Sequence, residues 1–118
     1  EASDFRGETL ITYPVERSRL DIFSQLLIPA KVEPAAVRQA ELTAVILLLV
    51  ASNRGVSVLP DWVVREVKYS SDYVTRPLTK NGLTRRLYAA IRSEERDKPY
   101  MQRLIELARI EARKLQDA

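Results

Sequence analysis

The sequence predicts an α/β domain built on a mostly parallel sheet of about five strands. The first observation behind this prediction is an alternation along the chain of short β-branched segments and longer segments with apolar residues at helical spacing. The second is the length: 118 residues fit one domain with a single modest core. We therefore expect residues 1–118 to form one α/β lobe.

The N-terminal part of the chain predicts a strand followed by a helix. Residues 9–13 (TLITY) are β-branched and aromatic, as is typical of a strand, and a proline follows them. Ser18 and Asp21 resemble a capping box that begins a helix, and Pro29 ends it. The apolar residues of this helix recur at helical spacing: Leu20, Phe23, Leu26 and Leu27.

The middle of the chain continues the alternation. Residues 37–40 predict a strand, whereas the apolar run at 43–51 fits either a buried strand or a buried helix. We predict a helix, because Asn-Arg-Gly at 53–55 supplies a cation near a helix C-terminus and a glycine for the left-handed residue after it. Residues 56–59 then predict a buried strand, and residues 61–68 a short helix with an acidic first turn.

The C-terminal part predicts two strands and a long helix. Residues 74–77 and 86–91 have strand composition, and the Asn-Gly pair at 81–82 is typical of a turn that would make them antiparallel neighbours. Residues 99–116 carry a wide apolar stripe at helical spacing. The resulting order, β-α-β-α-β-α-β-β-α, predicts a Rossmann-like lobe of three layers.

The composition argues against an enzyme. The chain has no histidine and no cysteine, which excludes zinc fingers, thiol nucleophiles, disulfides and histidine general bases. It also has no phosphate-binding glycine motif and no nucleophile elbow. We therefore predict no catalytic residues, no metal site and no cofactor. A module that binds a ligand or a partner is the default expectation.

Charge and hydropathy restrict the partners. Residues 1–84 have no net charge, and the net charge of +3 comes from residues 85–118, where acidic residues interleave with the arginines. This pattern argues against direct DNA binding. The longest apolar run, residues 44–51, is far shorter than the roughly 18–20 residues that span a bilayer. We expect a cytoplasmic protein and no membrane partner, and the absence of an initial methionine suggests a piece of a longer chain.

Three corners between a strand and a helix are candidates for a ligand site, because ligands of parallel sheets bind outside the carboxyl ends of the strands. The first two combine hydroxyl groups with a helix N-terminus, which suits a carboxylate. Arg17 and Arg19 would add positive charge, and Glu41 would accept an ammonium group. These parts together suit a zwitterionic amino acid. The corner residues are Tyr13, Pro14 and Ser18, then Ala40, Glu41 and Thr43, then Leu59 and Pro60 before Asp61 and Trp62.

Each of these residues also has a purely structural interpretation. Ser18 and Thr43 are typical helix caps, and exposed arginines are usually solvated. Glu41 would complement a helix dipole, and Trp62 would lie in a core or an interface. Both interpretations stay open from the residues alone.

Three segments in order resemble a known family. Residues 49–64 (LVASNRGVSVLPDWVV) are similar to the effector-binding region of LysR-type transcriptional regulators. Residues 8–21 (ETLITYPVERSRLD) and 86–92 (RLYAAIR) resemble the branch of this family that regulates methionine biosynthesis. The resemblance extends from about residue 4 to residue 99.

The resemblance implies an architecture and a ligand. Such regulators have an N-terminal winged helix-turn-helix that binds DNA and two periplasmic-binding-protein-like lobes with a small-molecule effector between them, here expected to be homocysteine. This chain matches the second lobe only, so DNA is a partner only through the missing N-terminal domain. The helix at 99–116 would pack on the absent first lobe, and the protein would associate into dimers or tetramers.

Carried over by position, the cleft-facing residues of the family fall on the same three corners. They are Tyr13 and Pro14, the junction from Gln39 through Glu41 to Thr43, and Leu59 and Pro60. Two other interpretations remain: a lobe of a two-lobed solute-binding protein, which shares this architecture, and a module that serves mainly for oligomerisation.

Overall fold

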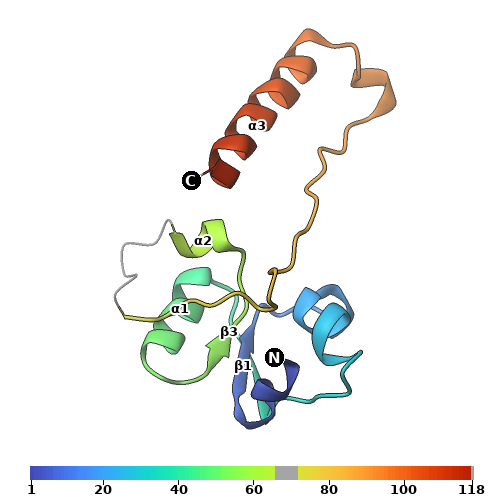
Figure 1. The fold of residues 1–118 in the computed structure, drawn as a ribbon. Coiled ribbons are helices and arrows are strands. Elements are labelled where there is room, and N and C mark those ends of the chain that lie inside the picture. The colour runs from blue at the N-terminus through green and yellow to red at the C-terminus, as the bar shows by residue number, and fades with distance from the viewer. Residues whose placement is uncertain (66–71, 118) are drawn as a thin grey trace. The chain divides into compact units, whose positions relative to one another are not determined.

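A computed structural model describes residues 1–65 and 72–117 of the chain (Figure 1). The chain divides into two compact units, Glu1–Leu83 and Thr84–Ala118. The first unit contains the sheet and the core, and the second contains the long C-terminal helix.

The sheet of the first unit has three parallel strands in the order β2-β1-β3. These are β1 (Thr9–Thr12), β2 (Ala36–Gln39) and β3 (Val56–Ser57). Leu10 of β1 lies opposite Val37 of β2 and Val56 of β3. The parallel direction confirms the expected sheet, and the strands lie where residues 9–13, 37–40 and 56–59 predict them, with β3 shortened to two residues.

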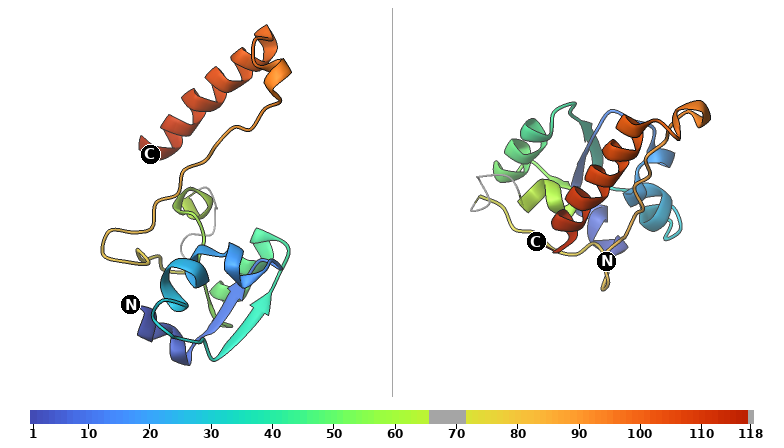
Figure 2. Two further views of the ribbon diagram at one scale, coloured as in Figure 1. Left: turned by 90° about the vertical axis from the view of Figure 1, so that its right-hand side faces the viewer. Right: turned by 90° about the horizontal axis from the view of Figure 1, so that it is seen from above.

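Helical segments cover the two faces of this sheet. Leu10 is fully buried and packs in a cluster with Phe23 and Leu27 of the segment η3 (Ile22–Leu27). Ile11, the next residue of the strand, faces the other side of the sheet, because side chains alternate along a strand. The helix α1 (Thr43–Ala51) contacts β1 and β3, and it lies across the sheet from η3 in Figures 1 and 2.

The predicted capping box at residues 18–21 is wrong, although a helical segment does follow it. Ser18 lies inside a short 3-10 turn, η2 (Arg17–Arg19), and its side chain caps nothing. Asp21 precedes η3, which is a π-helix, but its carboxylate accepts a hydrogen bond from the Gln25 amide at 3.0 Å and makes no cap. Two short helical turns replace the single expected α-helix.

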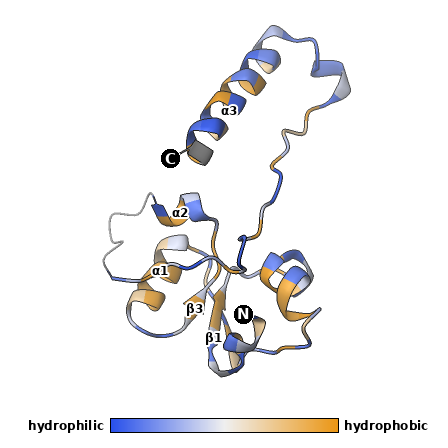
Figure 3. Cartoon of the chain, in the orientation of Figure 1, coloured by the Kyte–Doolittle hydropathy of each residue, from blue (hydrophilic) through white to orange (hydrophobic). Residues whose placement is uncertain are grey.

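The helix α1 has the bounds that the apolar run predicts, and it is hydrophobic along nearly its whole length (Figure 3). Ile46 and Leu47 are buried, whereas Leu42 before the helix and Leu48 within it are each 65% exposed. A helix that is apolar after Thr43 therefore covers the sheet with one side and leaves an apolar stripe on the other.

The glycine expected at the C-terminus of this helix has a different role. Asn53, with φ +55°, adopts the left-handed conformation that ends α1. Gly55 has φ +149°, and a Cβ there would lie 2.3 Å from the carbonyl oxygen of Thr9. Gly55 is therefore required because β3 approaches β1 closely, and not because a helix ends there.

After β3 the chain forms the short helix α2 (Asp61–Arg65). The Asp61 carboxylate accepts the backbone N–H of Trp62 at 2.9 Å and pairs with Arg65 at 3.0 Å. The predicted helix extends to residue 68, and residues 66–68 lie outside the part that the structure describes.

The prediction of strands at 74–77 and 86–91 is wrong. Both segments are extended in the structure, but neither joins a ladder, so the described residues form three strands and not about five. The side chains of Val74 and Leu87 are 87% and 97% exposed. The Asn-Gly turn does form, with Gly82 at φ +69° and its N–H bonded to the Thr79 carbonyl, but no hairpin follows it. Residues typical of strands are favoured where they pack on a half-buried sheet surface, and the side chains of these two segments do not pack on such a surface here.

The second unit confirms the long terminal helix. A 3-10 turn, η4 (Ser93–Glu95), precedes α3 (Pro99–Asp117). Ion pairs one turn apart support its polar side, Arg103–Glu106 and Glu111–Lys114, both at 2.6 Å. Among the residues that the structure describes, no helix is both long and apolar enough to cross a membrane.

Candidate functional site

The structure joins two of the three predicted corners at the carboxyl edge of the sheet. Tyr13 follows β1 directly, and its phenolic oxygen lies 2.6 Å from Oγ1 of Thr43, the first residue of α1. The bond is partly buried and connects residues 30 positions apart. The first and second corners therefore lie side by side at this edge.

The N-terminus of α1 has no side-chain cap. Leu42 occupies the cap position, and its carbonyl accepts the N–H groups of Val45 and Ile46. The Thr43 hydroxyl is bonded to Tyr13, so the interpretation of Thr43 as a cap is wrong. The positive end of the α1 dipole thus lies beside a tyrosine–threonine pair, an environment that favours an anionic group.

Gln39 and Glu41 lie on the same edge, between β2 and α1. The N–H of Ala40 donates to the Thr12 carbonyl at 2.9 Å and extends the pairing of β1 with β2 by one residue. This bond positions the junction, while both Gln39 and Glu41 expose their side chains. No ion pair within the described residues engages Glu41.

Arg17 is directed to other partners. Its Nη1 lies 2.7 Å from Oε2 of Glu33, and its guanidinium lies over the ring of Phe23, 4.8 Å from the centroid. Arg19 pairs loosely with Glu16 at 3.9 Å. Pro14 and Ser18 are exposed, and the Ser18 hydroxyl has no hydrogen bond in the described structure.

The third corner is built separately. The Ser57 hydroxyl donates to the Ile11 carbonyl at 2.8 Å and holds β3 beside β1. Leu59 is half-buried, Pro60 is exposed, and Trp62 is 46% exposed, so the core interpretation of this tryptophan is wrong. Among the described residues, no hydrogen bond joins this corner to Tyr13 or Thr43.

Sequence reasoning missed Thr12. It is the last residue of β1, its side chain is 6% exposed, and its hydroxyl has no hydrogen-bond partner in the described structure. Buried hydroxyl groups are usually paired, so an unpaired one at the end of the central strand is a candidate contact for a ligand or water. In the sequence, Thr12 could have been identified as a candidate because it carries a hydroxyl group and directly precedes Tyr13 and Pro14.

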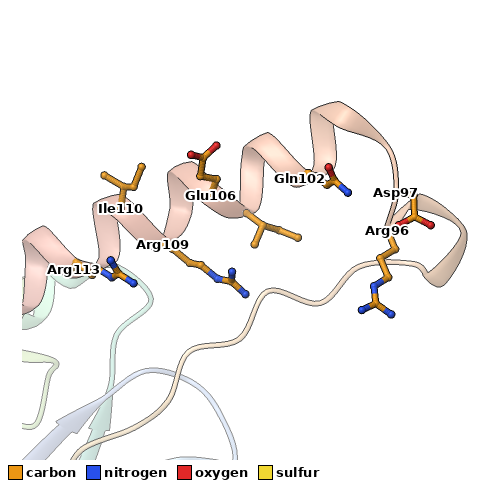
Figure 4. Close-up of a pocket in the computed structure, with 8 residues that line it drawn as sticks. Arg96, Asp97, Gln102, Glu106, Arg109, Ile110 and Arg113 are labelled. Atoms are coloured by element: carbon orange, nitrogen blue, oxygen red, sulfur yellow. The ribbon is translucent and has the colours of Figure 1, made fainter.

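Two hollows lie away from these corners, one in each unit. The larger, about 660 Å³, runs along α3 and contains none of the predicted site residues (Figure 4). A second, about 590 Å³, lies in the first unit between its N-terminus and the loop at residues 76–80. The described residues include no group of three or more side chains suited to a metal ion.

Comparison with known proteins points to one family. Residues 1–113 match the model described as the LysR substrate binding domain. The HTH-type transcriptional regulator MetR of Escherichia coli K12 is 40% identical over 106 residues, which are 90% of this chain and 33% of that protein. MetR of Haemophilus influenzae is 39% identical over 102 residues, 86% of this chain and 33% of that protein. The chain therefore spans about a third of the length of these relatives.

A solved structure gives the same result. The regulatory domain of MetR from N. meningitidis, a LysR family regulator, superposes with a TM-score of 0.77 at 47% identity. The matched region covers 86% of this chain and 47% of that domain. The relatives are transcriptional regulators and not enzymes, in agreement with the composition.

Proposed function

Because the chain belongs to the LysR substrate binding domain family, we propose that it is the second lobe of the effector-binding region of a regulator of methionine biosynthesis, with homocysteine as the effector. The MetR names of the relatives support the methionine branch. The match to about half of a solved regulatory domain supports one lobe of two. The relatives are regulators, and nothing observed favours a solute-binding protein.

The hydrogen bond between Tyr13 and Thr43 carries the proposal, because it gathers two corners at the uncapped N-terminus of α1. The carboxylate of the amino acid binds there, where helix N–H groups and the dipole favour a negative charge. Glu41, exposed on the same edge, accepts the ammonium group, and Gln39 supplies an amide beside it. A zwitterion matches this pairing of charges.

The remaining corner residues complete the ligand's surroundings. Leu59 and Pro60 offer apolar contacts for the side chain of the ligand, and Pro14 and Ser18 line the entrance beside Tyr13. Arg17 contacts the ligand only if its ion pair with Glu33 breaks and the guanidinium pairs with the ligand carboxylate instead. Each of these roles is part of the proposal.

The terminal helix provides the attachment to the first lobe in this proposal. Leu104 and Leu107 of α3 are 59% and 42% exposed, and Ile110 is 41% exposed. An apolar stripe of this kind is typical of a surface that another element covers. We propose that residues 99–117 pack on the first lobe, and that the complete cytoplasmic protein self-associates and binds DNA through its N-terminal domain.

The mechanism in this proposal is a shift between two arrangements of the lobes. An effector that contacts both lobes favours the arrangement in which both sets of contacts are made, in proportion to its difference in affinity. The oligomer then transmits this change to the DNA-binding domains.

Thermal denaturation of the complete two-lobed region tests the proposal. A ligand that binds only the folded state raises the melting temperature by mass action. We expect homocysteine to raise it more than methionine does, and alanine, the control amino acid, to leave it unchanged. An unchanged melting temperature with homocysteine at millimolar concentration would exclude homocysteine as the effector.

A further inference from the structure

The cavity of about 590 Å³ in the first unit is separate from the effector corner, since none of the corner residues lines it. Its apolar lining comes from Ala2, Leu26, Pro77 and Leu78. Ala2, Leu26 and Leu78 also pack against the core cluster around Leu10. The floor of the cavity is thus continuous with the hydrophobic core, whereas its mouth is open to solvent.

The polar side chains that line this cavity fall into two groups. The Glu1 carboxylate accepts the backbone N–H of Asp4, and the Thr79 hydroxyl donates to the Gly82 carbonyl at 2.7 Å. Arg76 and Lys80, by contrast, make no ion pair within the described residues. Two cations with no carboxylate partner in that part of the chain therefore flank an apolar hollow.

The loop that carries these cations has a defined shape. The N–H of Gly82 donates to the Thr79 carbonyl at 3.0 Å, and the Thr79 hydroxyl returns a bond to the Gly82 carbonyl. Leu78 is anchored on the core between Arg76 and Lys80. Both cations are thereby placed at the rim without a bond that a ligand must break.

We propose that this cavity is a second ligand site, which takes an amphipathic monocarboxylate such as a short-chain aliphatic acid. The acyl chain lies on Leu26, Pro77 and Leu78, and the carboxylate lies between Arg76 and Lys80. An aliphatic amine does not fit between Arg76 and Lys80, because both of these charges at the rim are positive. A polyanion without an apolar part leaves the floor empty.

The acyl chain gives this proposal a quantitative signature. Each methylene moved from water onto an apolar surface strengthens binding about threefold to fourfold. Affinity for this chain should therefore rise in that ratio per methylene from butanoate to hexanoate. Nonspecific association of a carboxylate with surface arginines and lysines does not depend on chain length.

The experiment is a titration of the complete two-lobed region with butanoate, hexanoate and hexanol, followed by amide chemical shifts in NMR spectra. We expect saturable shifts with hexanoate at the amides of residues 76–80 and of Leu26, and weaker binding of hexanol. Equal binding of hexanol and hexanoate overturns the assignment of a carboxylate. Absence of saturable binding, or shifts centred elsewhere, overturns the site.

Two variants and one control separate charge from shape. Arg76→Gln combined with Lys80→Gln should weaken hexanoate binding about threefold to tenfold, since exposed charge pairs are individually weak. Ala2→Leu, which fills the cavity and keeps both charges, should also weaken it. Lys31→Gln removes an exposed cation of the same unit outside the cavity and should leave binding unchanged. If the double variant and Ala2→Leu both bind hexanoate like the parent chain, the proposal is wrong, and homocysteine binding at the corner is unaffected by that result.

Discussion

The phenolic oxygen of Tyr13 and Oγ1 of Thr43 lie 2.6 Å apart, and their hydrogen bond ties the end of the central strand to the first residue of α1. This hydrogen bond between side chains holds two strand–helix corners together at the carboxyl edge of the sheet. Leu42 occupies the cap position of this helix and has no polar side chain, so the N–H groups of the first turn have no side-chain cap.

Removal of either hydroxyl from this pair should destabilise the first unit. We expect Tyr13→Phe and Thr43→Val each to lower the free energy of unfolding by about 0.5–1.5 kcal/mol, the usual net value of a partly buried hydrogen bond. The double variant should cost less than the sum of the two, since both remove the same bond. Urea denaturation measures these values, and Tyr88→Phe, which alters an exposed tyrosine, is the control. Strict additivity of the two changes would show that the bond contributes nothing.

Gly55 should not tolerate a side chain. Gly55→Ala places a Cβ 2.3 Å from the Thr9 carbonyl oxygen at φ +149°, so β3 must move away from β1. We expect a loss of about 2 kcal/mol or more in stability, in the range of substitutions that create strain. Gly7→Ala is the matched control, because a Cβ at Gly7 meets nothing within 4 Å. Similar melting temperatures for the two variants would contradict this account of Gly55.

The core around Leu10 should be sensitive to truncation. Leu27→Ala removes a fully buried side chain and should cost about 2–5 kcal/mol. Leu87→Ala changes a side chain that is 97% exposed and should alter stability by less than about 0.5 kcal/mol in this chain. Chemical denaturation of both variants tests the two values. An equal loss from both would show that Leu87 is buried in solution.

The ammonium contact assigned to Glu41 predicts a loss of effector affinity. Glu41→Gln keeps the shape of the side chain and removes its charge, which should weaken homocysteine binding to the two-lobed region about tenfold or more. Trp62 is the single tryptophan of this chain and is partly exposed, so its fluorescence is one means of following the titration. Glu8→Gln, at an exposed carboxylate before β1, is the control. Unchanged affinity in Glu41→Gln would remove Glu41 from the site.

Glu33 and the effector carboxylate should compete for Arg17. Glu33→Gln releases the guanidinium from its 2.7 Å ion pair and should tighten homocysteine binding up to about fivefold, the value of an exposed pair. Arg17→Gln should weaken binding by a similar factor. Calorimetric titration of both variants measures the two changes. Effects of the same sign, or none, would show that Arg17 is a structural residue tied to Phe23 and Glu33.

Local signals in the sequence predict the elements whose defining pattern lies within a few consecutive residues. The bounds of α1 follow from the apolar run at 43–51, and β1 follows from TLITY, since both patterns depend on residues within a few positions. The segments at 74–77 and 86–91 have equally good strand composition, but a strand also needs a paired edge. That requirement depends on distant residues, so composition alone predicted strands that the described structure does not contain.

For the proposed site, the sequence predicts which corners of the sheet come together but not the side-chain contacts within them. Parallel strands place their carboxyl ends at one edge, so the order of strands and helices along the chain is enough to place Tyr13, Gln39 and Glu41 near one another. The pairing of Tyr13 with Thr43, and the diversion of Arg17 to Glu33, depend on side-chain directions that spacing does not reveal. The unpaired hydroxyl of Thr12 becomes visible only when burial is known.

The position of β1 in the sheet has a consequence for the order in which the lobe assembles. The strand precedes β2 and β3 in the sequence, yet it is central, and one of its edges pairs with β3, whose Ser57 binds a residue 46 positions earlier. Pairing across such a separation is entropically costly and slow. During synthesis β1 therefore leaves the ribosome before both of its neighbours, and until Val56 and Ser57 appear it presents an open edge to other chains.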